Sequence, residues 1–142
     1  IRTVGKKPDG TDWRIGINSP NGNGIIGTLS LGEAAVVTSG SYLRCFEENG
    51  TLYHHIIDPQ SGYPADNGLV SVTVVADDAS LADGLSTAFF VMGMDKAVNC
   101  AQKLGVEAVF VTETTITVTQ GLKKSFTPDK SIEGVYKTIY LD

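Results

Sequence analysis

Two short segments contain the residue types that could carry chemistry in this chain. His55 begins the string His55-Ile56-Ile57-Asp58-Pro59-Gln60-Ser61-Gly62-Tyr63-Pro64, in which an apolar run leads into a proline-bounded turn. Imidazole is the side chain best suited to exchange a proton at neutral pH. Asp83 and Thr87 lie four residues apart in Ala82-Asp83-Gly84-Leu85-Ser86-Thr87-Ala88 and would share one face of a helix. The sequence therefore offers a candidate base and two hard oxygen donors of the kind that suit Mg²⁺.

Each of these features also has a purely structural interpretation. His54 and His55 would point to opposite sides of a strand, so they could simply fill a hairpin, and they cannot readily share one metal ion. Asp83 could stabilise the positive end of a helix dipole, and Thr87 could lie on a solvated face. Gly84 favours a functional role, because a glycine inside a helix costs about 1 kcal/mol and often marks close approach by a ligand or another backbone. Spacing alone leaves both interpretations open.

The dipeptide Asn49-Gly50 predicts a β-hairpin that presents His55. It is a strong signal for a two-residue turn, here between strands expected at residues 42–47 and 51–57. This turn fixes the register, so Phe46 should face Tyr53 and Arg44 should face His55. We expect the positive charge of Arg44 to help keep the His55 imidazole neutral.

A helix is expected around Asp83 and Thr87. Asp78 or Ser80 can cap its start, and Gly93 is a plausible stop. The predicted buried stripe follows three- and four-residue spacing and comprises Leu81, Leu85, Ala88 and Met92. Asp83 and Thr87 would then face away from the core, with Phe90 one turn further along their side.

Strand-like segments make up most of the remaining sequence. They are expected at residues 13–18, 25–31, 34–38, 69–76, 106–111, 115–119 and 135–141, with a loop at 19–24 and a second helix at 95–104. The length suits one domain, residues 1–142. We therefore predict an α+β domain in which two helices pack on one side of a largely antiparallel sheet.

Composition excludes several classes of function. The formal net charge is −5 and the basic residues are scattered, so the electrostatic field would repel a nucleic acid. Cys45 and Cys100 have neither zinc-site nor redox-pair spacing, and we expect both to be buried packing residues. No apolar run approaches the roughly 18 residues needed to span a bilayer.

Four motifs follow one another in a fixed order along the chain. They are Thr38-Ser39-Gly40-Ser41-Tyr42, the string beginning at His55, Val70-Ser71-Val72-Thr73-Val74-Val75-Ala76, and Ala82-Asp83-Gly84-Leu85-Ser86-Thr87-Ala88-Phe89-Phe90-Val91-Met92-Gly93. In order and spacing they resemble the ApbE family of bacterial flavin transferases, over nearly the whole chain. The resemblance implies a T-fold-like domain. Because family members are longer, this chain is expected to be the C-terminal half of the usual one, without the part that supplies much of the FAD pocket.

The resemblance implies a specific reaction. ApbE family members use Mg²⁺ to cleave FAD and transfer FMN to a threonine or serine hydroxyl of a target protein, releasing AMP. Some instead hydrolyse FAD to FMN and AMP. It implies His55 as the base on the acceptor hydroxyl and Asp83 and Thr87 as side-chain metal ligands. The residues expected to bind the flavin nucleotide are Ile57, Arg44, Ser39 and Gly40.

The implied partners are FAD and an acceptor protein with a flavinylated threonine or serine. The oligomeric state is left open. The resemblance suggests a bacterial protein that is exported or membrane-anchored on the extracytoplasmic side. A non-catalytic flavin-binding module is a further alternative, although such a module would have no need of a base beside a metal.

Overall fold

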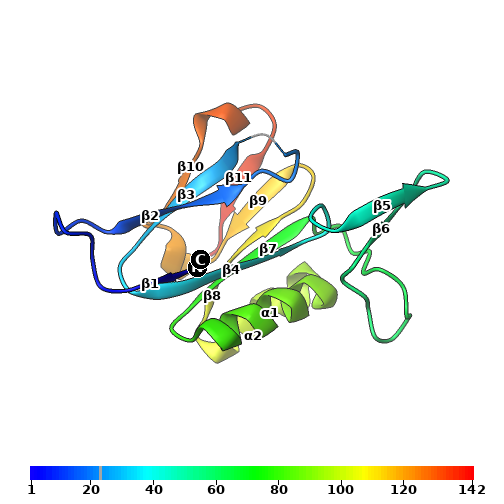
Figure 1. Ribbon diagram of the computed structural model, residues 1–142, viewed down its shortest axis with the longest axis horizontal. Helices are drawn as coiled ribbons and strands as arrows, with labels where there is room; N and C mark the ends of the chain where they lie inside the picture. The colour runs from blue at the N-terminus through cyan, green and yellow to red at the C-terminus, as the bar shows by residue number, and fades with distance from the viewer. Residues whose placement is uncertain (23) are drawn as a thin grey trace.

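A six-stranded sheet forms the centre of the structure, a computed structural model that describes residues 1–22 and 24–142 (Figure 1). Its strands lie in the order β1-β4-β7-β8-β9-β11, and all neighbours are antiparallel except β9 and β11. Their bounds are Arg2–Thr3 for β1, Ala34–Gly40 for β4, Ser71–Ala76 for β7, Glu107–Val111 for β8, Thr115–Val118 for β9 and Lys137–Tyr140 for β11.

A three-stranded antiparallel sheet covers one face of this central sheet. It has the order β10-β3-β2, with β2 at Trp13–Asn18, β3 at Ile25–Leu31 and β10 at Phe126–Pro128. One hydrophobic core lies between the two sheets and includes Ile15, Ile26, Leu29, Val36, Val109 and Ile116. Short 3₁₀ helices at Gln120–Leu122 and Lys130–Ile132 flank β10.

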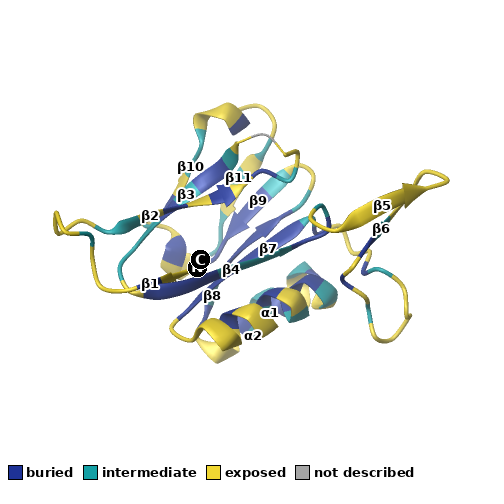
Figure 2. Cartoon of the chain, viewed as in Figure 1, coloured by how far each residue is buried: buried dark blue, intermediate teal, exposed yellow. Residues whose placement is uncertain are grey.

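Two helices cover the opposite face of the central sheet (Figure 1). They are α1 at Ala79–Met92 and α2 at Met94–Leu104. The alternation of side chains along β4 sends Val37 toward the helices and Val36 toward the second sheet. All residues of β7 are buried, because both of its faces are covered (Figure 2).

A two-stranded hairpin projects from the end of the central sheet (Figure 1). It consists of β5 at Cys45–Glu48 and β6 at Thr51–His54. Asn49 and Gly50 have φ values of 52° and 75°, as a tight primed turn requires. The predicted register is confirmed, since Phe46 pairs with Tyr53. Their rings stack with centroids 5.2 Å apart.

The predicted fold class is confirmed, with two helices on one side of a mainly antiparallel sheet. The second strand of the hairpin was expected to continue to Ile57 but ends at His54. Strands β1 and β10 were not predicted, because each has too few residues to show a pattern. Asn23, in the predicted loop 19–24, lies outside the described residues. Among the residues described, no helix has the length and apolar character to cross a membrane.

The predicted buried stripe of α1 was right for Leu85, which packs against the core, but wrong at its two ends. Leu81 and Met92 are 46% and 40% exposed, whereas the buried residues are Ala82, Ser86, Phe89 and Phe90. The small Ala82 and Ser86 fit against the sheet, and the two phenylalanines fill the space near the end of the helix. Phe90 therefore belongs to the core and not to the exposed side.

The expectation that both cysteines are packing residues was wrong for Cys45. It lies exposed on β5, because the hairpin has no layer on either side to cover it. Cys100 in α2 is partly buried and packs against the helix side of the core.

Candidate functional site

The end of β4 meets the middle of α1 through a cluster of hydroxyl groups. Ser39 Oγ lies 2.8 Å from Ser86 Oγ and 3.0 Å from Thr87 Oγ1. Ser86 Oγ in turn donates to the carbonyl oxygen of Asp83 at 2.9 Å. The fold thus brings Ser39, from the first motif, against Thr87, from the last.

Asp83 and Thr87 lie on the exposed surface of α1, whereas Ser86 is fully buried beneath them. Asp83 is not needed to start the helix, because the Asp78 side chain accepts from the Leu81 N–H at 2.7 Å. Of the two predicted capping residues, Asp78 and Ser80, Asp78 is the one that caps the helix. The location of Asp83 and Thr87 away from the core agrees with the sequence analysis.

The donors on this face fit part of a Mg²⁺ coordination sphere. A carboxylate and a hydroxyl one helical turn apart are hard oxygen ligands. Within residues 1–22 and 24–142, no group of three or more His, Cys, Asp or Glu side chains is arranged to hold a metal ion. Mg²⁺ commonly keeps several waters and takes further oxygens from substrate phosphates. Asp83 and Thr87 thus offer two of the oxygen ligands that such an ion would need.

The two histidines have different environments. His54 is buried, its Nε2 lies 3.1 Å from the carbonyl oxygen of Ala65, and its Nδ1 accepts from the Ile56 N–H at 3.3 Å. Both contacts are made when Nε2 carries the proton and Nδ1 does not. The His54 ring also meets Phe90 edge to face, with centroids 5.6 Å apart. His54 therefore fixes the chain after the hairpin to the end of α1.

His55 is exposed, and its backbone continues the hairpin pairing by one residue. Its N–H donates to the carbonyl oxygen of Arg44 at 3.2 Å, which keeps these residues opposite one another as the register predicted. Arg44 is also exposed, and Ile57 is 46% exposed and bridged to Pro64. The side chain of His55 is thus free to meet a ligand while its backbone is held.

The base of the hairpin contacts α1 at Phe90. Phe90 packs against His54, and Asn67 Nδ2 donates to the Phe90 carbonyl at 2.8 Å. Phe90 lies three residues beyond Thr87, a rise of about 4.5 Å along a helix. In the described part of the chain no hydrogen bond joins His55 to Asp83 or Thr87. Their relation depends on the packing of the hairpin base against α1.

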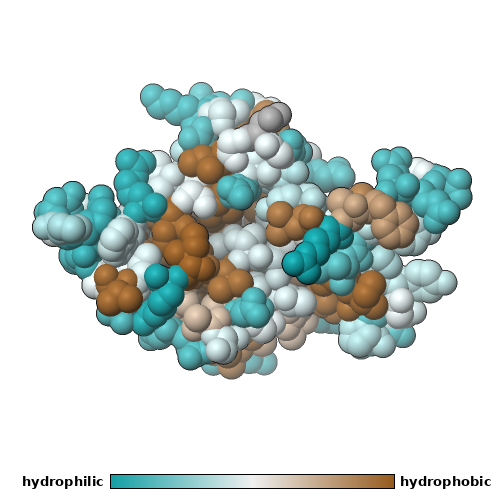
Figure 3. All heavy atoms as spheres, viewed as in Figure 1, coloured by the Kyte–Doolittle hydropathy of each residue, from teal (hydrophilic) through white to brown (hydrophobic). Residues whose placement is uncertain are grey.

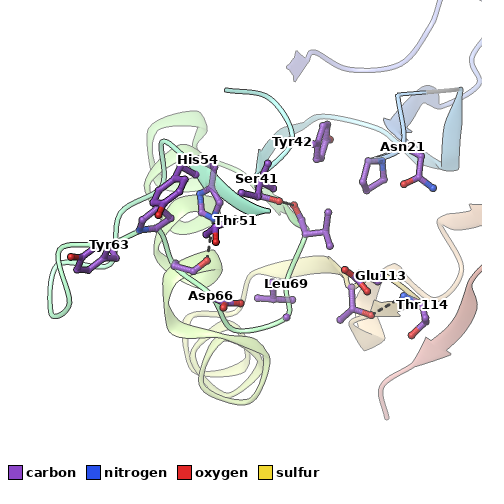
Figure 4. Close-up of a pocket in the computed structure, with 18 of the residues that line it drawn as sticks. Asn21, Ser41, Tyr42, Thr51, His54, Tyr63, Asp66, Leu69, Glu113 and Thr114 are labelled. Atoms are coloured by element: carbon purple, nitrogen blue, oxygen red, sulfur yellow. Dashed lines mark hydrogen bonds between the residues drawn. The ribbon is translucent and has the colours of Figure 1, made fainter. Parts of the chain in front are cut away.

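An open groove of about 1230 Å³ lies beside the hairpin. One side is formed by the hairpin and the following turn, with His54 and Tyr63, and the other by the region of Asn21 and Thr114 (Figure 4). The hairpin end of the molecule also carries exposed apolar side chains, namely Leu43, Phe46, Leu52, Ile57 and Tyr63 (Figure 3). His55, Asp83 and Thr87 do not line the groove among the residues described.

The ring of Tyr42 fills the space that a side chain at Gly40 would need. Tyr42 also lines the groove. A Cβ at Gly40 would lie 2.6 Å from Tyr42 Cε1 and 3.2 Å from the Val70 carbonyl oxygen. Burial also raises the pKa of the Tyr42 phenol above its ordinary value, so the hydroxyl stays protonated at neutral pH. The structure thus gives Gly40 a packing role that its assignment to cofactor binding did not include.

Replacing Gly40 by alanine should destabilise the protein by about 1–3 kcal/mol, because the new methyl group overlaps the Tyr42 ring. Chemical denaturation would measure the loss. In a Tyr42→Ala background the ring is gone and the same substitution should cost clearly less. Equal costs in both backgrounds would show that Tyr42 does not explain the glycine.

Replacing Gly84 by alanine should have the opposite effect. Gly84 is exposed inside α1, and a Cβ built there meets no atom within 4 Å. Alanine should stabilise the helix by about 0.5–1 kcal/mol, measured by thermal unfolding. If a ligand approaches this glycine closely, the variant should bind FAD more weakly despite its higher stability. A lower melting temperature would contradict the open environment of Gly84.

The structure brings together some of the residues predicted from the sequence and separates others. Ser39 meets Thr87 within hydrogen-bond distance, and Ser86 connects Ser39 to the main-chain carbonyl oxygen of Asp83. The remaining predicted residues are not in this cluster: His55, Arg44 and Ile57 lie at the hairpin base, and Gly40 lies beneath Tyr42. Ser86 was missed, although a hydroxyl residue between two apolar ones on the buried side of a helix is a usable signal.

The chain is similar in sequence and in structure to known proteins of one family. The sequence model of the ApbE family matches residues 1–110. The FAD:protein FMN transferase of Klebsiella pneumoniae (strain 342) is 43% identical over 107 residues, which cover 72% of this chain and 33% of that protein. The ApbE protein of Thermotoga maritima, a solved structure, has a TM-score of 0.70 and 38% identity, covering 94% of this chain and 41% of its own.

A second solved structure, the flavin transferase ApbE from Vibrio cholerae, has a TM-score of 0.65 and 30% identity and covers 92% of this chain. The match spans 40% of the Vibrio chain. This chain therefore spans well under half the length of the relatives that it matches.

Proposed function

This chain belongs to the ApbE family, and on that basis we propose that the protein containing it transfers FMN from FAD to a hydroxyl group of a target protein. The name FAD:protein FMN transferase, which a relative at 43% identity carries, supports this choice of reaction. Since the chain spans only part of the relatives, the reaction is proposed for the full-length protein.

In the proposed reaction, the threonine or serine oxygen of the acceptor forms a bond to the phosphorus of the FMN portion of FAD. The bond from this phosphorus to the bridging oxygen breaks, and AMP leaves with that oxygen. His55 takes the proton of the acceptor hydroxyl as its oxygen attacks. A base in this position contributes about 10²–10⁴-fold to the rate. The exposure of the His55 side chain supports this role, because a protein acceptor must reach it.

We assign the binding of Mg²⁺ to the Asp83 carboxylate and the Thr87 hydroxyl. The bound ion would neutralise charge on the two phosphates of FAD. Asp83 and Thr87 hold the metal side of the site on a rigid helix, and the hairpin base holds the base side. Ile57 and Arg44, which adjoin His55, and Ser39 and Gly40, at the end of β4, would contact the flavin nucleotide.

One observation carries this proposal most directly. Ser39 and Thr87 lie 48 residues apart in the sequence, in two different motifs, and meet at 3.0 Å on an accessible surface. The same helix contacts the hairpin base through Phe90 and His54. These two contacts support the proposal because α1 touches both the end of β4 and the base of the hairpin.

The experiment incubates a full-length protein carrying this sequence with FAD, Mg²⁺ and a threonine-containing acceptor protein. A fluorescent acceptor heavier by one FMN, together with released AMP, is the expected result. If FAD binds but neither an adduct nor free FMN forms, transfer and hydrolysis are both excluded, and the protein is a flavin-binding module. Free FMN and AMP that form at the same rate with or without the acceptor would instead indicate a pyrophosphatase.

A further inference from the structure

Three hydroxyl groups where β4 meets α1 form a chain of contacts. Ser86 Oγ donates to the carbonyl oxygen of Asp83 at 2.9 Å. Ser39 Oγ lies 2.8 Å from Ser86 Oγ and 3.0 Å from Thr87 Oγ1. Each hydroxyl has one proton to donate and two lone pairs that accept. The three contacts therefore use three protons.

Only one order of protons makes all three contacts hydrogen bonds. A carbonyl oxygen cannot donate, so the Ser86 proton is committed to Asp83. Ser39 must then donate to Ser86, and Thr87 must donate to Ser39. The Thr87 proton consequently points toward β4, and both lone pairs of Thr87 Oγ1 remain available on the exposed side of the helix.

We propose that Ser39 and Ser86 are positioning residues that turn the Thr87 hydroxyl proton inward and its lone pairs toward a divalent cation. This inference rests on the proposed function, in which Thr87 is a Mg²⁺ ligand. A cation is attracted by oxygen lone pairs and repelled by the hydroxyl proton. An isolated, exposed threonine hydroxyl rotates and presents its proton to the cation for part of the time. The fixed direction of these hydrogen bonds removes that orientation.

Ser86 is the fixed end of this row of hydrogen-bonded hydroxyl groups. It is fully buried, and its bond to Asp83 lies within the same helix, so its proton is held independently of solvent. Without the Ser86 hydroxyl, the Ser39 proton is free to turn toward Thr87, and the Thr87 proton must then point outward. The loss of a buried hydroxyl that does not touch the metal should therefore weaken metal binding.

The test measures binding of Mn²⁺, as a probe for Mg²⁺, to a full-length protein carrying this sequence. Electron paramagnetic resonance of free Mn²⁺ gives the dissociation constant without any turnover. Thr87→Val removes the proposed ligand and keeps its shape, so it should weaken binding most. Ser39→Ala and Ser86→Ala should each raise the dissociation constant by about tenfold, the lower end of the effect of groups that orient metal ligands.

Matched variants separate positioning from a general effect on the fold. Ser39→Thr keeps the hydroxyl and should retain wild-type affinity. Ser80→Ala changes an exposed serine near the start of α1 and should leave affinity unchanged. In a Thr87→Val background, Ser39→Ala should add little, because its effect acts through Thr87.

The outcomes distinguish this inference from the function on which it rests. If Thr87→Val weakens Mn²⁺ binding but neither Ser39→Ala nor Ser86→Ala does, the positioning role is wrong and the metal site stands. If wild type binds no Mn²⁺, or Thr87→Val has no effect, the metal role of Thr87 fails, and the inference fails with it. Should Ser86→Ala not fold, the partly exposed Ser39 carries the test through its alanine and threonine variants.

Discussion

In a full-length protein carrying this sequence, replacing His55 by alanine should lower the rate of the proposed FMN transfer by about 10²–10⁴-fold, the contribution of a positioned general base. The folded structure should be preserved, because the His55 side chain is exposed and the bond that holds it comes from its backbone N–H. Affinity for FAD should change little. The measurement is release of AMP and labelling of the acceptor, together with thermal unfolding of the same sample.

The neighbouring histidine is the matched control for this prediction. His54→Ala removes a buried ring that contacts Phe90 and bridges the Ala65 carbonyl and the Ile56 N–H. It should destabilise the protein and disturb the loop after the hairpin. His55→Ala should instead lose activity at nearly unchanged stability. Full activity in His55→Ala would show that His55 is not the base. A loss of stability as large as that of His54→Ala would favour a structural role for His55.

The hairpin shows how much local sequence can predict. The Asn49-Gly50 dipeptide alone predicted the turn, the register and the pairing of Phe46 with Tyr53. Both residues have the positive φ that such a turn requires. The end of β6 could not be predicted in the same way. The strand stops at His54 because that ring turns inward to bond Ala65 and the Ile56 N–H, and these contacts depend on a loop further along the chain.

Helix α1 shows why its buried face was misplaced. Hydrophobic spacing selected the larger residues Leu81 and Met92, but the sheet accepts the small Ala82 and Ser86 at the contact. Close approach of a helix to a sheet depends on the shape of both surfaces, which a periodicity does not contain. The same limit hid the hydroxyl cluster, because the partner of Thr87 is Ser39, 48 residues away.

Residue type drew attention to Asp83 and Thr87, although their role as metal ligands stays a prediction. A carboxylate and a hydroxyl at Asp83 and Thr87 were selected because they suit a hard cation, and both lie on the accessible face of α1. Gly40 could not be interpreted from its sequence neighbours alone, since its reason is the ring position of Tyr42. The exposure of Asp83 and Thr87 was therefore easier to predict than the packing around Gly40.

Replacing Phe90 by alanine should lower the free energy of unfolding by about 3–5 kcal/mol, as expected for a large aromatic side chain removed from a core. Phe90 is 0% exposed, and its ring contacts His54 edge to face. A loss of this size is a large part of the total stability of a typical domain, about 5–15 kcal/mol. Denaturant unfolding would measure it.

Phe89→Ala separates the role of Phe90 at the hairpin base from its role in the core. Phe89 is also 0% exposed, but its ring packs against Phe110 in β8. Both variants should lose similar stability. Only Phe90→Ala should also accelerate amide hydrogen exchange between residues 54 and 67, because it removes the support of His54. Since that segment begins beside His55, its loosening should lower the transfer rate of any remaining folded protein more than Phe89→Ala does. Identical exchange patterns in the two variants would show that Phe90 does not couple α1 to the hairpin base.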